Sequence, residues 1–411
     1  MRIAVVGAGG REHALAWALG HTADVVVVPG NAGMVRFGLS CAPSLDAAGP
    51  VDLVVIGPEQ PLVDGLADQQ RAKGTPVFGP GADGARLEGS KAHLKQVLQR
   101  AGVPTAASRA FRAGDEAAAE TFLLSMNGPW VVKTDGLAAG KGVLVADDVE
   151  EAVADVRAKL SGASFGAAGR TVVIEEGLTG PEVSVLAICD GRTADDAVVV
   201  LPVARDHKRV GDGDAGPNTG GMGAFSPVGG VPADLSEQVL ETMVLPTLHT
   251  LAADGVDYRG VLYAGIMLTP EGPKLLEYNV RFGDPEAQVV LPRLDGDLAT
   301  LLASAAAGRI DPSTIAVRPE VCVGVVLAAP GYPTSPVTGA TISGLEDAGP
   351  LVFCAGVAEQ GGRLVTSGGR VLCVAALGRD GPRARASAYA AADHVSFKSG
   401  ALRREDIAAT A

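Results

Sequence analysis

The stretch LLEYNVRFGDPE, residues 275–286, places three polar side chains at alternate positions where an apolar run ends: Glu277, Asn279 and Arg281. Alternate residues of a β-strand project from one face of the sheet, so we expect these side chains to point together. Carboxylate and amide oxygens are ligands that Mg²⁺ and Mn²⁺ prefer, with water and phosphate oxygens completing the shell. The stretch therefore predicts a strand with a Mg²⁺ or Mn²⁺ site formed by Glu277 and Asn279. A solvated polar strand end is the plainer alternative.

The composition is that of a globular α/β protein with several domains. Of the 411 residues, 47% are hydrophobic and 20% are charged, which excludes a disordered chain. The net charge of −13 argues against a nucleic-acid partner, because a phosphate-binding surface needs clustered basic residues. Five scattered cysteines, with no CxxC pair, predict neither a disulfide framework nor a zinc site.

No apolar stretch approaches the roughly 18 residues that a membrane span needs. The first residues, MRIAVVGAGG, lack the features of a secretory signal and are better interpreted as a buried strand. We therefore expect no membrane partner and a cytoplasmic location.

Apolar runs in the first 100 residues predict a parallel sheet. The runs at 3–7, 25–30, 53–57 and 77–79 alternate with alanine-rich helical stretches, and most lead into turns rich in glycine or proline. The turns should gather at the carboxyl edge of the sheet, where ligands bind. A helix with Ser90 as its N-cap and Gly102 as its stop should close this region.

The segment VVKTDGLAAGKGV, residues 131–143, predicts a strand with Lys133, a glycine-rich turn and a second strand. Glycine lets backbone N–H groups approach phosphate oxygens, and the lysines of the segment, Lys133 and Lys141, add positive charge. The segment is not a Walker A loop, because the GxxxxGK[ST] order is absent. A lid over phosphates is the functional interpretation, and a surface hairpin is the plain one.

The segment VVIEEGLTGPEVSV, residues 172–185, places Glu175 and Glu176 where a strand ends. Such a connection can offer backbone donors and acceptors to an adenine edge, while Glu182 can bond a ribose hydroxyl. Two solvated glutamates are the alternative.

Two further loops are candidates for phosphate binding. In GAGGREH, residues 7–13, Glu12 stands where the dinucleotide fingerprint GxGxxG requires glycine, which disfavours a nicotinamide-dependent dehydrogenase. The glycines before Arg11 still indicate a small phosphate site at a helix start, with a structural tight turn as the alternative. Residues 206–224 form a glycine-rich stretch that suits neither helix nor strand. We expect a binding loop in which Lys208 and Arg209 hold a phosphorylated sugar. A solvated basic turn is the alternative.

Taken in chain order, motifs along essentially the whole sequence resemble those of the phosphoribosylamine–glycine ligases, also called glycinamide ribonucleotide synthetases, of the ATP-grasp superfamily. The motifs are GGREHALAW, PGNAG, GPEQPLV, FGP, LEGSKA, KTDGLAAGKGV, IEEGLTGPEVS, DHKRVGD, GPNTGGMGA, EYNVRFGDPE and SGGRVLCV. LEGSKA, DHKRVGD, GPNTGGMGA and NVRFGDPE are specific to these enzymes, whereas the lysine strand and the ExN pair occur across the superfamily.

The resemblance implies ATP-dependent joining of glycine to 5-phosphoribosylamine, with Mg²⁺ or Mn²⁺ as cofactor, small molecules as the only partners, and a monomer or weak homodimer. It implies an N-terminal αβ substrate domain (1–100), an ATP-grasp linker and lid (101–190), a central ATP-grasp domain with the metal site (191–325) and a small C-terminal α+β domain (326–411). Lys133 and Arg281 would be catalytic. The implied ATP-binding residues are Lys95, Lys133, Gly140, Lys141, Gly142, Glu175, Glu176, Leu178 and Glu182. The implied substrate-binding residues are Gly9, Gly10, Arg11, Glu12, Asp206, Lys208, Thr219, Gly220 and Arg281.

One departure from the superfamily concerns the metal. Gly265 stands where many ATP-grasp enzymes carry a further acidic ligand, so the metal would rest on Glu277 and Asn279, unless Asp284 or Glu286 supplies an oxygen. Two rival functions share the same nucleotide-binding motifs: another ATP-grasp ligase or carboxylase with a different nucleophile, and a nucleotide sensor that binds ATP without turnover.

Overall fold

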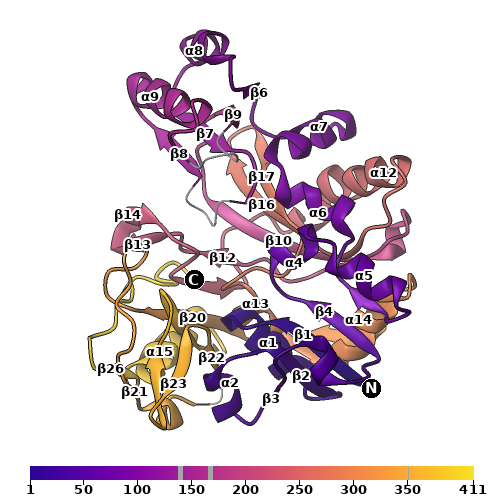
Figure 1. The fold of residues 1–411 in the computed structure, drawn as a ribbon, viewed down its shortest axis with the longest axis vertical. Coiled ribbons are helices and arrows are strands. Elements are labelled where there is room, and N and C mark those ends of the chain that lie inside the picture. Colours follow the sequence, from indigo (N-terminus) through magenta and orange to yellow (C-terminus); the bar gives the residue numbers. More distant parts are fainter. Residues whose placement is uncertain (138–141, 165–169, 350) are drawn as a thin grey trace.

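The computed structural model describes residues 1–137, 142–164, 170–349 and 351–411. The chain forms several sheets: the N-terminal strands and the C-terminal strands lie in the lower part of Figure 1, and a separate small sheet lies at the top. Within the described residues, no helix is both long enough and apolar enough to cross a membrane.

The N-terminal region is a five-stranded parallel sheet in the order β3-β2-β1-β4-β5. The strands are β1 (Arg2–Gly7), β2 (Asp24–Pro29), β3 (Ser40–Cys41), β4 (Leu53–Ile56) and β5 (Val77–Phe78). The helices are α1 (Gly10–Leu19), α2 (Ala32–Arg36), α3 (Leu45–Ala48), α4 (Glu59–Val63), α5 (Leu66–Ala72), α6 (Ala82–Gly89) and α7 (Lys91–Ala101). The four predicted strands are confirmed, and their apolar residues are buried as expected for a parallel sheet covered on both faces.

The predicted boundaries of α7 are also confirmed. The Ser90 hydroxyl accepts a hydrogen bond from the His93 N–H at 3.1 Å, and Gly102 ends the helix in the left-handed region with φ +68°. The left-handed conformation strains a residue with a Cβ, which explains why glycine stands there.

A separate four-stranded antiparallel sheet, in the order β6-β9-β7-β8, forms the upper part of Figure 1 and is called the lid sheet below. Its strands are β6 (Ser108–Arg112), β7 (Trp130–Thr134), β8 (Val143–Ala146) and β9 (Thr171–Glu176). It carries α8 (Glu116–Leu124) and α9 (Val149–Leu160). The predicted pair of strands around the glycine-rich turn is confirmed, because β7 pairs with β8.

The central sheet has the order β11-β10-β16-β17. Its strands are β10 (Glu182–Asp190), β11 (Val198–Val200), β16 (Arg259–Thr269) and β17 (Gly272–Asn279). The associated helices and short strands are α11 (Leu235–Val239), α12 (Leu245–Ala253), α13 (Ala287–Val290), β18 (Leu294–Gly296), α14 (Leu298–Ala306) and β19 (Ile315–Val317). Because β10 pairs with β16, Glu182 lies on this sheet and not on the lid sheet.

The last sheet combines early and late parts of the chain in the order β12-β15-β20-β25-β22. Its strands are β12 (Arg205–Asp206), β15 (Gly223–Ser226), β20 (Val321–Ala328), β22 (Val352–Cys354) and β25 (Arg370–Gly378), and α15 (Gly381–Ala392) packs on it. Small strand pairs flank it: β13 (Arg209–Gly211) with β14 (Ala215–Asn218), β21 (Ile342–Ser343) with β26 (Ser396–Phe397), and β23 (Val357–Gln360) with β24 (Arg363–Thr366).

The expectation that residues 206–224 form a loop without strands is wrong. The segment contains the antiparallel hairpin β13–β14 and then enters β15, which pairs with β20. Residues 212–214 make the turn between the two hairpin strands, and the positive φ of Gly213 (+64°) fits a sharp turn. The glycines that argued against strands lie largely in the turns between them.

Candidate active site

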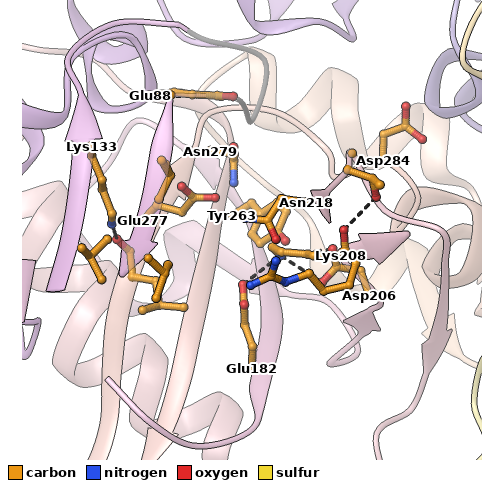
Figure 2. A pocket seen from close by; sticks show the side chains of 18 of the residues that line it. Glu88, Lys133, Glu182, Asp206, Lys208, Asn218, Tyr263, Glu277, Asn279 and Asp284 are labelled. Carbon is orange, nitrogen blue, oxygen red and sulfur yellow. Dashed lines mark hydrogen bonds and ion pairs between the residues drawn. The ribbon is translucent and has the colours of Figure 1, made fainter. Parts of the chain in front are cut away.

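A single cavity of about 1000 Å³ collects most of the predicted site residues. Figure 2 shows the side chains that enter it from several elements: Lys133 from β7, Glu277 and Asn279 from β17, Glu182 from β10, and Lys208 from the segment after β12. The cavity therefore lies where the lid sheet, the central sheet and the β12–β15 segment meet.

Glu277 and Asn279 lie on the cavity face of β17, as the alternation predicts. Tyr278 between them is 1% exposed, and its hydroxyl lies 3.2 Å from that of Thr247 on the opposite side of the sheet. On the neighbouring strand, Gly265 pairs in register with Glu277, so no carboxylate stands at that adjacent position.

The two acidic residues considered as further metal ligands already have partners. Asp284 is paired with Arg370 at 2.9 Å and accepts from the Gln288 amide at 2.6 Å. Glu286 accepts from the Tyr263 hydroxyl at 2.6 Å. Within the described ranges, no three His, Cys, Asp or Glu side chains are grouped to hold a metal. Glu277 and Asn279 offer one carboxylate and one amide oxygen, a hard but incomplete ligand set that fits Mg²⁺ if phosphate and water oxygens complete it.

The charge of Glu277 is maintained by lysines around the cavity. Burial alone would raise the pKa of its carboxyl, but the positive charges of Lys133, Lys208 and Lys91 lower that pKa below its usual value on balance. Glu277 is therefore a carboxylate at neutral pH. A half-buried anion held by cations is ready to accept a metal without first losing a proton.

Lys133 and Lys95 share one buried carboxylate. The Glu175 Oε2 atom lies 3.1 Å from Lys133 Nζ and 3.2 Å from Lys95 Nζ, and Glu175 is 2% exposed. Its other oxygen, Oε1, is buried and has no hydrogen-bond partner among the described residues. Burial lowers the pKa of Lys133, but Glu175 and Glu277 raise it on balance, so Lys133 is a cation on the cavity wall. Lys95 is not among the described residues that line the cavity, but it contacts Glu175, which does.

Arg281 follows β17 and is tied down by two acids. Its guanidinium pairs with Glu88 at 2.9 Å and with Glu59 at 3.2 Å, and it also donates to Asn279 Oδ1 at 3.2 Å. Glu88 belongs to the LEGSKA motif, and its other carboxylate oxygen accepts the Val280 N–H at 2.8 Å. Sequence reasoning missed Glu88 as a site residue, although the motif that contains it was recognised.

The connection after β9 lines the cavity with Glu176, Gly177 and Leu178. Its backbone is fixed by hydrogen bonds from Glu176 N to Ala107 O at 3.0 Å and from Gly177 N to Pro129 O at 2.7 Å. Gly142 also lines the cavity. The predictions for Gly140 and Lys141 concern positions outside the described residues.

The β12–β15 segment forms the opposite rim. Lys208 Nζ lies 2.8 Å from Glu182 Oε1 and 3.0 Å from Asp206 Oδ1, so these three predicted residues form one cluster. The Thr219 hydroxyl donates to the Lys208 carbonyl at 2.8 Å, and the Gly220 N–H donates to the Tyr332 hydroxyl at 2.9 Å.

Arg370 is a cavity residue that the motif SGGRVLCV contains but that sequence reasoning did not assign. Its guanidinium donates to the carbonyl of Gly220 at 2.5 Å and pairs with Asp284. A basic residue at the start of a strand gives no local signal of this contact, because its partners lie far away in the sequence. Asn218 and Tyr332 line the same side and were missed for the same reason.

Of the predicted residues around the start of α1, only one lines the cavity. Arg11 lines it, but Gly9, Gly10 and Glu12 are not among the described lining residues. Glu12 turns back on the helix start, where it accepts from the Gly9 N–H at 2.6 Å and from Arg11 Nε at 2.5 Å. A carboxylate thus already satisfies the donors that a phosphate would need. Substrate binding by Gly9, Gly10 and Glu12 stays a prediction.

Comparison with known proteins covers almost the whole chain. Three family models match: Phosphoribosylglycinamide synthetase, N domain, over residues 1–88; its ATP-grasp (A) domain over 89–287; and its C domain over 322–410. The phosphoribosylamine–glycine ligase of Caulobacter vibrioides is 47% identical over 422 residues, which are 98% of this chain and 97% of that protein.

The fold is similar to those of two solved structures. The crystal structure of phosphoribosylamine–glycine ligase from Thermotoga maritima has a TM-score of 0.88 and 37% identity, and the match covers 99% of this chain and 100% of that one. The biotin carboxylase domain of the Hydrogenobacter thermophilus 2-oxoglutarate carboxylase, solved with ADP magnesium salt, has a TM-score of 0.73 and 16% identity over 97% of this chain and 91% of that one, which shows a shared fold alone. By its family models, its full-length relatives and its fold, the chain belongs to the phosphoribosylamine–glycine ligase family, within the ATP-grasp enzymes.

Proposed function

We propose that this protein joins glycine to 5-phosphoribosylamine in de novo purine synthesis, with conversion of ATP to ADP and phosphate and with glycyl phosphate as the intermediate. The observation that carries the proposal is the cavity that Lys133, Glu277 and Asn279 line together with Lys208 of the rim. One wall has the charges for a nucleotide triphosphate, and the other has those for a phosphorylated sugar.

Glu277 and Asn279 would hold Mg²⁺, or Mn²⁺, with hard oxygen ligands, and a bound cation would offset the negative charge of the terminal phosphates of ATP. ATP would lie between the lid sheet and the central sheet. Its binding residues would be Lys95, Lys133, Gly140, Lys141, Gly142, Glu175, Glu176, Leu178 and Glu182, with the adenine at residues 175–178 and the ribose at Glu182. The Oε1 atom of Glu175, which has no hydrogen-bond partner among the described residues, would accept a hydrogen bond from a ligand donor.

The reaction needs activation of glycine, because a carboxylate does not acylate an amine. A glycine carboxylate oxygen attacks the γ-phosphorus of ATP, the bond to the β-phosphate oxygen breaks, and ADP leaves. The amine of phosphoribosylamine then attacks the glycyl carbonyl, expels inorganic phosphate and loses a proton. Lys133 and Arg281 supply the positive charges beside the transferring phosphoryl group, so catalysis is mainly positioning and electrostatics.

Four of the predicted substrate-binding residues lie together on the rim of the cavity. Asp206, Lys208, Thr219 and Gly220 are on the rim, where they would hold the phosphorylated sugar together with Arg11. A cytoplasmic location and a monomer or weak homodimer are part of the same proposal. So is the domain division at residues 100, 190 and 325, except that β10, which pairs with β16, belongs with the central region and not with the lid.

A three-substrate omission assay tests the reaction. With ATP, glycine and phosphoribosylamine present, we expect ADP, phosphate and glycinamide ribonucleotide in equal amounts, and no sustained ADP formation when glycine is omitted. ADP formation that proceeds without glycine would instead indicate another nucleophile, as in a carboxylase. ATP binding without ADP under any mixture would indicate a sensor.

The intermediate has its own test. If glycyl phosphate forms reversibly, ATP labelled with ¹⁸O in its β,γ-bridge should scramble the label into non-bridging positions when glycine is present and phosphoribosylamine is absent. Scrambling that requires phosphoribosylamine would contradict a separate first step.

A further inference from the structure

The side chain of Arg404 is fully buried at the edge of the cavity rim, and the mechanism above does not use it. It is 1% exposed, and its three guanidinium nitrogens all have oxygen partners. Nε and Nη2 contact the Asp406 carboxylate at 2.6 and 2.7 Å, and Nη1 contacts Asp214 Oδ1 at 2.7 Å and the Arg209 carbonyl at 3.1 Å. A buried guanidinium requires such pairing, because an unpaired charge in the interior is strongly unfavourable.

Two of the partners of Arg404, Arg209 and Asp214, lie in the hairpin β13–β14. Arg209 begins β13, and Asp214 ends the turn with a φ of +55°, an unfavourable conformation for a residue with a side chain. Two backbone contacts add to the attachment: Gly213 N–H donates to Asp406 Oδ2, and Glu405 N–H donates to Asp212 Oδ1, each at 2.8 Å. Residues 404–406 thus hold the turn from one side. Figure 1 marks the C-terminus close to β12 and to this hairpin.

The hairpin has little else to stabilise it. Every residue of β14 is exposed, and the β13–β14 register contains an irregularity between Arg209 and Gly211. A two-stranded hairpin is marginal in water without support from other elements. Yet Arg209, Asp214 and Asn218 all line the cavity, so the position of this hairpin decides the shape of its rim.

We propose that Arg404 is a positioning residue for the sugar-phosphate side of the active site: it holds the hairpin β13–β14 over the cavity through Asp214 and the Arg209 carbonyl. The nature of the ligand at the rim rests on the proposed function. Arginine suits this task because its planar fork reaches two carboxylates and a carbonyl at once, whereas lysine offers one point charge.

The test compares Arg404→Gln with Arg403→Gln in the full chain. Arg403 is a matched control: it is the neighbouring arginine, and it also contacts two acids, Asp393 and Glu405, at 2.7 and 2.8 Å. Within the described residues, no hydrogen bond or ion pair joins its side chain to the hairpin. Binding of glycinamide ribonucleotide and of Mg-ADP is measured separately by calorimetry, together with the KM values for phosphoribosylamine and ATP.

We expect Arg404→Gln to weaken glycinamide ribonucleotide binding and raise the KM for phosphoribosylamine about tenfold, while Mg-ADP affinity changes less than about twofold. Arg403→Gln should change neither. Equal losses for both ligands, or wild-type binding of glycinamide ribonucleotide, would overturn the proposal. If Arg404→Gln does not fold, Asp214→Asn replaces it, because the Asp214 side chain is 58% exposed and its change removes the negative charge that Arg404 contacts at the hairpin.

Amide hydrogen exchange tests the positioning without any ligand. We expect faster exchange at residues 209–218 in Arg404→Gln and unchanged exchange there in Arg403→Gln, since local opening follows the loss of the attachment. Unchanged exchange in both variants would overturn the role of Arg404. If the wild-type protein does not bind glycinamide ribonucleotide while the two variants show this exchange pattern, the proposed substrate is refuted. The attachment of the hairpin by Arg404 is then still confirmed.

Discussion

The two sides of the cavity are built differently. On the proposed nucleotide side, Lys133, Glu175 and Glu277 lie on strands β7, β9 and β17. Lys133 and Glu175 are buried and form an ion pair, and nearby lysines keep the half-buried Glu277 charged. On the rim, Arg209 and Asn218 lie on a hairpin whose second strand is exposed, and a guanidinium far away in the chain holds its turn. The strands of the proposed nucleotide side belong to four-stranded sheets, whereas the two-stranded hairpin on the rim depends on contacts with a distant segment.

The largest effect should follow removal of a charge from the nucleotide side. We expect Glu277→Ala and Lys133→Ala each to lower kcat for ADP formation by about 100-fold or more, because each removes a charge that faces the transferring phosphoryl group. Initial-rate assays of ADP measure this effect, and circular dichroism checks the fold. Near-normal turnover in both folded variants would contradict the assignment of this side.

A change at Glu175 tests whether the ion pairs of the proposed nucleotide side stabilise the folded protein. Glu175→Gln leaves Lys95 and Lys133 without their shared anion, so we expect the free energy of unfolding to fall by about 3 kcal/mol. Glu176→Gln is the matched control: its side chain is 39% exposed, and its loss should cost less than about 1 kcal/mol. Urea unfolding measures both values, and equal losses would show that the buried lysines do not depend on Glu175.

The same difference explains what could be predicted from the sequence. Alternation along β17 predicted that Glu277 and Asn279 share a face, and apolar runs predicted four strands of the N-terminal sheet, because both signals are local. The two-residue strand β3 escaped notice because it is too short to show a pattern. The motif resemblance supplied the family, which no periodicity could give.

The errors concern contacts between distant segments. Glycines in residues 206–224 argued for a loop, but β15 pairs with β20, and this pairing, invisible in the local sequence, favours strands there. Likewise, nothing near Arg370 indicates that it reaches Gly220 and Asp284. Long-range pairing overrides local preference at these positions.

On the rim, removal of one exposed polar side chain should have a smaller effect. We expect Asn218→Ala to raise the KM for phosphoribosylamine about fivefold, as for one lost hydrogen bond, with the KM for ATP and the melting temperature unchanged. Asn127→Ala, at an exposed asparagine of the lid region that is not among the described cavity residues, is the control. A larger rise in the KM for ATP than in that for phosphoribosylamine would contradict the division of the cavity.

The smallest effect should be that of pH on the contribution of Glu277 to Mg-ADP binding. It tests whether Glu277 stays ionised between pH 5 and pH 8. Burial opposes the charge of Glu277, but the surrounding lysines lower its pKa on balance. A carboxyl whose pKa is lowered in the folded protein stays ionised above its unfolded value of about 4.3 and loses its contribution only as pH falls through the lower folded value.

We therefore expect the ratio of the Mg-ADP affinities of wild type and Glu277→Gln to vary less than about twofold between pH 8 and pH 5. The titration of ADP itself cancels in this ratio, because both proteins bind the same ligand. Calorimetry at several pH values measures the ratio. A ratio that falls towards one between pH 7 and pH 5 would mean that Glu277 takes up a proton in this range. The lysines would then not hold its charge, and the nucleotide side would be no more fixed than the rim.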